Sequence, residues 1–166
     1  MRLKTIPLYA VLAFAACTST NQSSNMTEDY TQYVNPFIGT DFTGNTYPGA
    51  QVPFGMVQLS PDNGLPGWDR ISGYFYPDST IAGFSHTHLS GTGAGDLYDV
   101  SFMPVTLPYK EAEAPLGIHS KFSHANESAY AGYYQVKLDD YNINVELTAT
   151  ERCGIQRYTF PKAEAA

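Results

Sequence analysis

The chain has 166 residues, a length that suits one domain with its own hydrophobic core. Only 15% of the residues are charged and 14% are aromatic, a profile that excludes a disordered chain and favours an all-β or sugar-handling protein. The formal net charge of −7 repels nucleic-acid phosphates, so a DNA- or RNA-binding role is excluded.

The first seventeen residues have the features of an export signal. Arg2 and Lys4 give a positively charged start, and residues 6–16 form an apolar stretch that is too short to span a bilayer. Small residues then precede Cys17. We predict a bacterial lipoprotein signal peptide over residues 1–17, in which Cys17 is lipidated and anchors the chain to the membrane. An ordinary cleaved signal peptide is the alternative.

A polar segment separates this leader from the rest of the chain. Residues 18–29 show no apolar periodicity, which predicts a flexible tether before a domain over residues 30–166. The protein is then expected to be exported and lipid-anchored, facing the periplasm or the cell surface. Beyond Cys17 the only cysteine is Cys153, so the domain is expected to be stable without an intrachain disulfide.

From residue 30 onward, short apolar or alternating runs are separated by Gly, Pro, Asn and Asp, and no stretch keeps a helical period for three turns. This pattern predicts strands over residues 55–60, 72–76, 81–89, 98–106, 133–138, 142–150 and 154–160, with a short strand near 118–122. In the clearest of them, Ile143, Val145 and Leu147 alternate with polar residues. We expect an all-β fold, an antiparallel β-sandwich that is incomplete because no closing element follows residue 160.

The segment GTGAGD, residues 91–96, is rich in glycine. A dinucleotide-binding fingerprint that starts at Gly91 would need glycine at position 96, where this chain has Asp96. A carboxylate at that position opposes a pyrophosphate, and no lysine completes a phosphate loop. We therefore expect a tight turn that lets the backbone approach a ligand or a neighbouring strand.

Two histidines precede this turn. His86 and His88 are two residues apart, so on a strand both rings would project from one face. That spacing is open to three interpretations: ligands of a metal-dependent hydrolase, hydrogen bonding to sugar hydroxyls or the adjoining loop, and structural packing. Asp96 and Asp99 are too close in sequence to be the two carboxylates of a glycosidase, and they are expected to bind hydroxyls or to brace the loop.

The sequence Gly67-Trp68-Asp69-Arg70 holds the only tryptophan of the chain. In a loop between strands, Trp68 could stack on the C–H face of a pyranose while Asp69 and Arg70 bind its hydroxyl groups. Core packing of the tryptophan is the alternative. These three residues, with His86, His88 and Asp96, are the candidate substrate-binding residues.

Several long motifs together resemble one known family. They are YVNPFIGT (33–40), YPGAQVPFGMVQLSPD (47–62), GWD (67–69), SGY (72–74), IAGFSHTHLSGTGAGD (81–96), FMP (102–104) and LDDYNINVELTATERCGIQRYTFP (138–161). The segment from about Tyr33 to Pro161 is similar to the N-terminal domain of glycoside hydrolase family 92, the calcium-dependent exo-acting α-mannosidases.

The resemblance implies an N-terminal β-sandwich packed against a larger C-terminal barrel of paired helices. It also implies an inverting mechanism in which a glutamic acid protonates the leaving oxygen, an aspartate activates water, and calcium helps to bind and distort the mannose. In the family these two carboxylates and most calcium ligands belong to the C-terminal domain. We therefore expect that this chain lacks the catalytic domain and is inactive alone.

Site residues carry over from the family only in part. Trp68 and Asp69 match the motif GWD and are expected to contact the terminal mannose, whereas Arg70 stands where the motif is less fixed. The resemblance places His86, His88 and Asp96 in the segment that shapes the domain interface and the rim of the pocket. No catalytic residue or principal metal ligand is assigned. The alternative functions are a stand-alone surface lipoprotein that binds glycans, and a metal-dependent hydrolase built on the two histidines.

Overall fold

The computed structural model describes residues 28–107 and 117–162. The predicted signal peptide, Cys17 and residues 18–27 of the predicted tether lie outside these residues. The described elements are the short 3-10 turns η1 (Tyr30–Tyr33), η2 (Trp68–Arg70) and η3 (His124–Asn126), and the strands β1 (Ser60–Asp62), β2 (Thr80–Ile81), β3 (Gly83–Ser85), β4 (Ser120–Lys121), β5 (Glu127–Tyr130), β6 (Tyr133–Leu138), β7 (Ile143–Ala149) and β8 (Gly154–Thr159). Within the described ranges, no helix has the length and apolar character needed to cross a membrane.

One antiparallel sheet, in the order β5-β6-β7-β8, forms a complete layer of the domain. The alternation predicted for residues 142–150 is confirmed, because Ile143, Val145 and Leu147 are fully buried. In the register of β6 and β7 they lie opposite Leu138, Val136 and Tyr134, which are also buried, so both strands contribute to one apolar face. Strand β8 is an edge strand with no fully buried residue.

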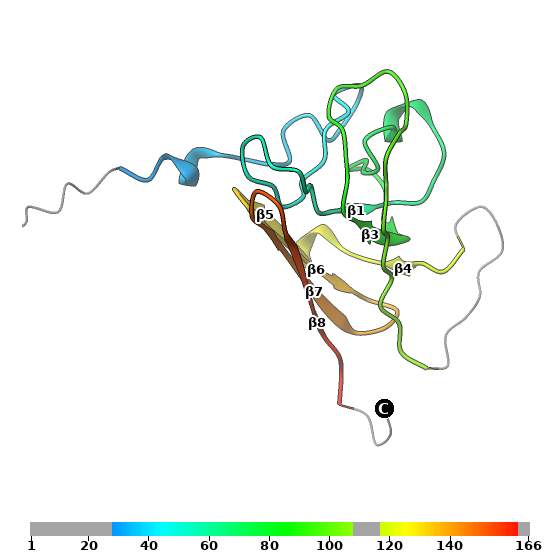
Figure 1. Cartoon of the computed structure of the whole chain (residues 1–166). Helices are drawn as coiled ribbons and strands as arrows, with labels where there is room; N and C mark the ends of the chain where they lie inside the picture. Colours follow the sequence, from blue (N-terminus) through cyan, green and yellow to red (C-terminus); the bar gives the residue numbers. More distant parts are fainter. Residues whose placement is uncertain (1–27, 108–116, 163–166) are drawn as a thin grey trace, which may run out of the picture.

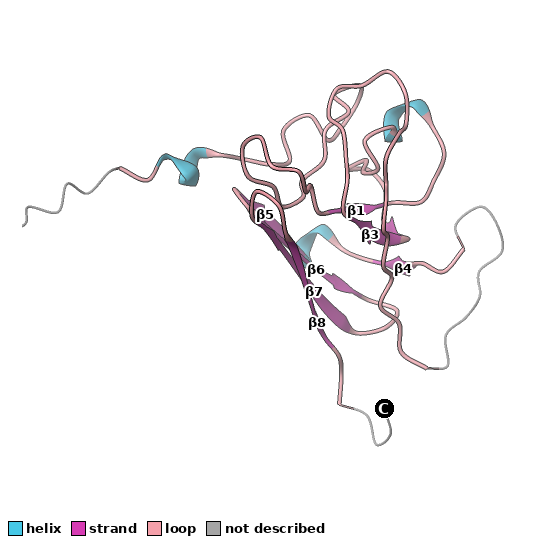
Figure 2. Cartoon of the chain, viewed as in Figure 1, coloured by secondary structure: helices cyan, strands magenta, loops and turns pink. Residues whose placement is uncertain are grey.

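A second layer of loops and two short antiparallel ribbons, β1-β3 and β2-β4, covers this apolar face (Figures 1 and 2). Leu59, Tyr74, Ile81 and Phe84 from this layer are completely buried in the same hydrophobic core. The predicted all-β fold with antiparallel sheets is therefore confirmed, and the two layers form a β-sandwich in which one layer is mostly irregular.

A buried asparagine substitutes for regular pairing in the loop layer. Asn63 is fully buried; its side-chain amide donates to the Thr80 carbonyl at 2.7 Å and its oxygen accepts from the Phe75 amide at 2.5 Å. These bonds join the start of β2 and the loop at Phe75 to the end of β1. They satisfy backbone groups that a strand ladder would otherwise satisfy.

Three predicted strands are wrong over most of their length. In 72–76, Gly73 has φ of 89°, and the amide of Tyr76 donates to the Thr40 carbonyl in a loop instead of a ladder. In 98–106, Tyr98 and Val100 have positive φ, and Phe102 alone makes an isolated bridge.

The strand predicted at 55–60 is also replaced by irregular backbone until Ser60, where β1 begins. Phe54, just before that stretch, has φ of 59°, and the bonds that follow are made to separate segments. The amide of Met56 donates to the Glu151 carbonyl and that of Gln58 to the His86 carbonyl. The predicted strand 81–89 is shorter, since β3 ends at Ser85.

A buried carboxylate links the two layers. Glu127 begins β5, a strand absent from the sequence prediction, and its side chain is only 1% exposed. It accepts hydrogen bonds from the hydroxyls of Tyr74 at 3.0 Å and Tyr134 at 2.6 Å, and from His124 Nδ1 at 2.6 Å. The His124 ring also stacks on Tyr76, with centroids 4.0 Å apart. The sheet, η3 and the loop layer therefore share one buried acceptor.

Replacement of Leu147 by alanine should destabilise the domain strongly. The side chain is fully buried between β6 and β8 in the register of the sheet, so its truncation removes apolar contacts and leaves a cavity. We expect a loss of about 2–5 kcal/mol in the free energy of unfolding, measured by urea denaturation. The Asn144→Ala variant in the same strand, on the opposite and exposed face with no side-chain hydrogen bond to a described residue, should change stability by about 0.5 kcal/mol or less. Equal losses in both variants would contradict the assigned core face.

The tyrosines bound to Glu127 predict an alkaline limit of stability. Burial, followed by the nearby charge of Glu127, raises the pKa of Tyr74 and Tyr134 above the usual 10.0. The unfolded chain therefore releases these protons first, so the stability they contribute is fully present below pH 10 and is lost as pH rises above it. Tyr134→Phe should show a shallower fall in urea midpoint above pH 10 than the unmodified chain, whereas Tyr30→Phe, at an exposed site, should leave the slope unchanged.

Candidate functional site

The predicted sugar-contacting tryptophan lies on the surface in η2. Gly67, with φ of 155°, leads into this short turn, and the Trp68 side chain is 61% exposed, so core packing is excluded. A Cβ placed on Gly93 would lie 3.6 Å from Trp68 Cη2, which shows that the indole lies beside the glycine turn 91–96. The GWD and GTGAGD segments, separate in sequence, are neighbours in the fold.

The two charged residues after Trp68 differ in their bonding. The guanidinium of Arg70 donates to Asp78 through Nε at 2.6 Å and Nη2 at 2.5 Å, and it lies over the ring of Phe75 at 4.7 Å. Hydrogen bonding to Asp78 raises the pKa of Arg70 further. Arg70 therefore braces the turn, and Nη1 with the second N–H of Nη2 is left for a ligand. Asp69 is half-buried and makes no side-chain hydrogen bond to the described residues.

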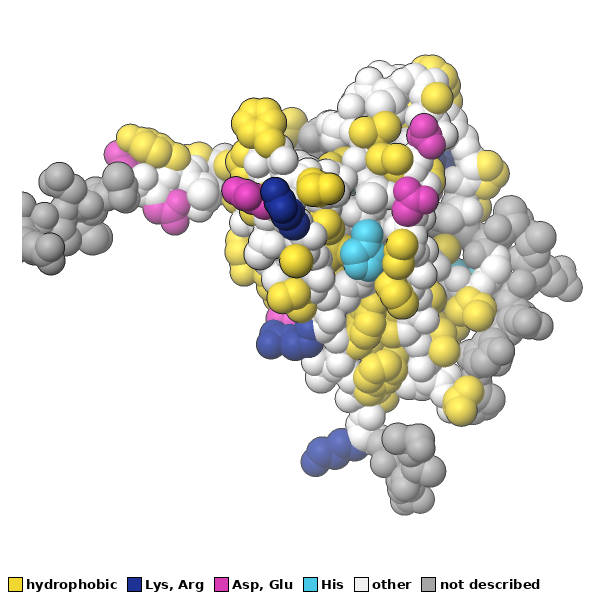
Figure 3. All heavy atoms as spheres, in the orientation of Figure 1, with side chains coloured by type: hydrophobic (Ala, Val, Ile, Leu, Met, Phe, Trp, Pro, Cys, Tyr) yellow, Lys and Arg dark blue, Asp and Glu magenta, His cyan; other side chains and the backbone are white. Residues whose placement is uncertain are grey.

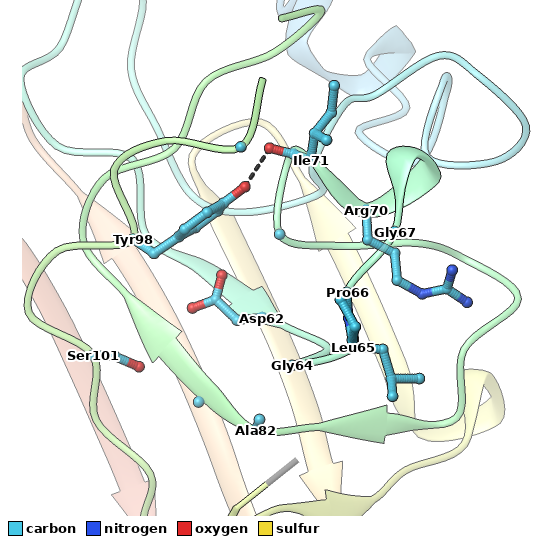
Figure 4. A pocket seen from close by; sticks show the side chains of 13 residues that line it. Asp62, Gly64, Leu65, Pro66, Gly67, Arg70, Ile71, Ala82, Tyr98 and Ser101 are labelled. Atoms are coloured by element: carbon cyan, nitrogen blue, oxygen red, sulfur yellow. Dashed lines mark hydrogen bonds between the residues drawn. The ribbon is translucent and has the colours of Figure 1, made fainter. Parts of the chain in front are cut away.

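A hollow of about 560 Å³ lies under this turn (Figure 4). Its walls come from the segment after β1, from β3 and from the loop after the glycine turn; the lining includes Asp62, Leu65, Pro66, Ile71, Ala82, Tyr98 and Ser101. The hydroxyl of Tyr98 donates to the Ile71 carbonyl and so ties the glycine loop to the GWD turn. Most of the wall is apolar, and Asp62 is its carboxylate.

A buried histidine holds Asp62. His88 is 2% exposed; its Nδ1 donates to the Gln58 carbonyl at 2.8 Å, and its Nε2 lies 2.8 Å from Asp62 Oδ1 and 3.1 Å from Ser85 Oγ. The ring packs between Tyr47 and Tyr98. A Cβ on Gly73 would lie 2.5 Å from Asp62 Oδ1, so only glycine leaves room for the carboxylate there. His88 thus positions Asp62 at the hollow, and does not line the hollow itself.

His86 points to a different environment from His88. Its Nδ1 lies 2.7 Å from the Val100 carbonyl, and its ring meets Phe102 edge-on at 5.8 Å and approaches Gln156 of β8. In the view of Figure 3, hydrophobic side chains gather over much of the visible face, and a histidine lies among them. The expectation that both rings share one strand face is wrong, because β3 ends at Ser85 and the backbone turns before His88.

Asp96 and Asp99 brace the loop, as one of the two sequence interpretations had it. Asp96 Oδ1 accepts from the amide of Leu97 at 2.8 Å, and Asp99 Oδ2 accepts from the hydroxyl of Thr87 at 3.2 Å. Leu97, Tyr98 and Val100 all have positive φ, an unfavourable conformation for residues with a Cβ. The surrounding hydrogen bonds hold the loop in this strained conformation, in which the Tyr98 side chain lines the hollow.

The described parts of the chain hold no group of three or more His, Cys, Asp or Glu side chains that could bind a metal ion. His88 is bound on both ring nitrogens, and His124 is bound to Glu127 and to the Tyr76 carbonyl. Within these residues no carboxylates cluster to hold a calcium ion, and a metal-dependent hydrolase built on His86 and His88 finds no support in the geometry.

Comparison with known proteins identifies the class. The family model for the glycosyl hydrolase family 92 N-terminal domain matches residues 33–166, and the chain therefore belongs to that family. This agrees with the resemblance carried by the sequence motifs.

Solved structures of the family share the fold. The family GH92 α-mannosidase BT3965 from Bacteroides thetaiotaomicron, also solved with mannoimidazole, is 47% identical over 81% of this chain, with a TM-score of 0.76. The inverting mannosidase BT2199 from the same organism is 30% identical over 84% of the chain, with a TM-score of 0.62. A protein of Arthroderma benhamiae described as an uncharacterized secreted glycosidase is 31% identical over 143 residues, which are 82% of this chain. The matched region spans only 18–19% of these relatives.

The link between His88 and Asp62 predicts unequal roles for the two histidines. His88→Ala leaves the Asp62 carboxylate without its buried partner and opens a cavity, so we expect a loss of about 2–4 kcal/mol in the free energy of unfolding. His86→Ala, at a partly exposed ring, should cost about 1 kcal/mol or less. Urea denaturation of both variants measures the difference, and a larger loss for His86→Ala would refute the assignment.

Proposed function

We propose that this chain is the carbohydrate-contacting N-terminal domain of an exported α-mannosidase that hydrolyses terminal α-mannosides of mannose-rich glycans with inversion. The leader with Cys17 supports export and lipid anchoring, and the description of one relative as secreted agrees with export. The names of BT3965 and BT2199 support the substrate class and, for the latter, the inverting mechanism.

The arrangement at η2 is the observation that carries this proposal. The exposed indole of Trp68 offers a face for the C–H groups of a pyranose, and the unpaired carboxylate of Asp69 lies next to it as an acceptor for hydroxyl groups. Asp62 adds a second acceptor at the hollow, and the glycine turn allows close approach of the backbone. In this proposal His88 acts through Asp62 and Asp96 shapes the rim from the glycine loop, while His86, whose ring lies beside Phe102 and Gln156, belongs to the domain interface.

In this proposal the catalytic step belongs to a region outside the matched N-terminal domain. The family resemblance attributes the acid, the base and most calcium ligands to a C-terminal helical barrel, and calcium would bind and distort the mannose there. Within the described residues no metal-binding cluster competes with that assignment. The chain alone is accordingly proposed to bind the sugar and to leave the glycosidic bond intact.

The single tryptophan gives a direct test of sugar contact. Because Trp68 is the only tryptophan in the chain, its intrinsic emission reports on η2 alone. Methyl α-mannoside and mannoimidazole should change the emission in a saturable way, and Asp69→Ala should weaken binding about tenfold through the loss of a charged acceptor. Emission that stays constant throughout the millimolar range of both ligands would refute contact at Trp68.

Hydrolysis assays test the absence of catalysis separately. The purified chain, supplied with calcium, should release no nitrophenol from 4-nitrophenyl α-mannoside. Activity that persists through purification would contradict the assignment of the catalytic carboxylates to another domain, while a binding signal without hydrolysis is the expected pair of results.

A further inference from the structure

The outer face of the four-stranded sheet carries a second hollow, remote from η2. It has a volume of about 540 Å³ and crosses all four strands. Its polar lining residues are Asn126, Glu127, Ser128, Gln135, Lys137, Asn144, Glu146 and Thr159, of which Glu127 turns its carboxylate into the core. This face is turned away from the core, because the core-facing residues of β6 and β7 alternate with the lining residues. In Figures 1 and 2, η2 lies on the far side of the loop layer from this sheet.

The strand register places the polar side chains in cross-strand rows. Ser128, Gln135, Glu146 and Arg157 follow one another across β5 to β8, and Lys137, Asn144 and Thr159 form the neighbouring row. A sheet holds such rows at fixed spacing, so the lining is set by regular strands. The hollow therefore has a more rigid floor than the loop-built one at η2.

Aromatic side chains close one end of these rows. Tyr130 and Tyr133 are stacked, with ring centroids 4.6 Å apart and planes inclined by 14°. The Tyr133 hydroxyl lies 3.0 Å from Gln135 Oε1 and 2.6 Å from Glu146 Oε1, to which it donates. Burial and this bond to Glu146 raise the pKa of Tyr133 to about 12, so the phenol remains a donor at neutral pH.

The charges of the hollow indicate what it can bind. Glu146 is paired with Arg157, whose Nε donates to Oε2 at 2.6 Å. Hydrogen bonding from Arg157 lowers the pKa of Glu146, so the pair is ionised and internally neutral. What remains is one lysine and several amides and hydroxyls. The side chains of Asn126, Ser128, Asn144 and Thr159 make no hydrogen bond to other described residues.

Planar amides carry a donor and an acceptor side by side, which matches two neighbouring hydroxyl groups of a sugar. Lys137 is the one cation among these side chains that is left without an acidic partner, too little positive charge to select an anionic ligand, and a protein partner would need an apolar centre that this lining lacks. We propose that the outer face of β5–β8 is a second carbohydrate-binding site, which takes neutral oligosaccharides independently of the site at Trp68.

An NMR titration of the 15N-labelled 166-residue chain tests this site by position. The probes are α-linked mannotetraose and maltotetraose, two neutral oligosaccharides of different hexoses. At least one should shift the backbone or side-chain amide signals of Gln135, Asn144 and Thr159 in a saturable way. Gln135→Ala/Asn144→Ala should weaken that binding about tenfold or more, since two amide contacts are lost.

Matched variants separate this site from the one at η2. Gln32→Ala removes an exposed amide in η1 and should leave the affinity unchanged, and Trp68→Ala should leave the shifts at Gln135 and Asn144 in place. Near-UV circular dichroism confirms that each variant is folded. The inference is overturned if neither probe shifts the sheet residues, if the double variant binds as tightly as the unmodified chain, or if Trp68→Ala abolishes the sheet response. Failure of Trp68 to respond would count against the proposed mannoside contact only.

Discussion

The burial of one carboxylate, Glu127, holds the two layers of this domain together. Hydrophobic contact between the layers is non-directional and would tolerate sliding, whereas three directed hydrogen bonds to Glu127 fix the loop layer and η3 on the sheet. The hollow under η2 is built from that loop layer, so its shape depends on the anchor. Ligand binding at the loop layer is therefore coupled to the free energy of unfolding of the sheet. A ligand that orders the loops stabilises the whole domain.

The regular part of the fold could be predicted from the sequence, because its signal is local. In 133–138 and 142–150 the apolar residues recur every second position and nothing in the strand opposes that pattern. Strand β5 was not predicted because its core-facing residues are Glu127 and Ala129, which give no apolar alternation. Polar partners distant in sequence make Glu127 acceptable in the interior. The strand expected at 72–76 has suitable residues, but the positive φ of Gly73 and the capture of its amides by loops prevent pairing.

For the site, the sequence indicated which segments carry the chemistry but not how they are used. Trp68 and the glycine turn were singled out, and the structure brings them together. The role of Asp62 was missed, because the partner that positions it is His88, 26 residues away, and no local pattern links them. His88 itself is a buried support, which the spacing of two histidines could not reveal, since that spacing assumed a strand that ends at Ser85.

The edge position of β8 has a consequence for any polypeptide that lies beside it. The backbone N–H and C=O groups on its outer side can pair with a neighbouring strand. The alternation of side chains in the sheet then determines the sequence pattern that this strand needs. Residues placed opposite Gln156 and Tyr158 would face the core layer, and residues placed opposite Arg157 would extend the polar rows of the outer face. The edge therefore favours a strand that is apolar at every second position and polar between. The register of that strand is set by Arg157, whose side chain is on the outer face of the sheet.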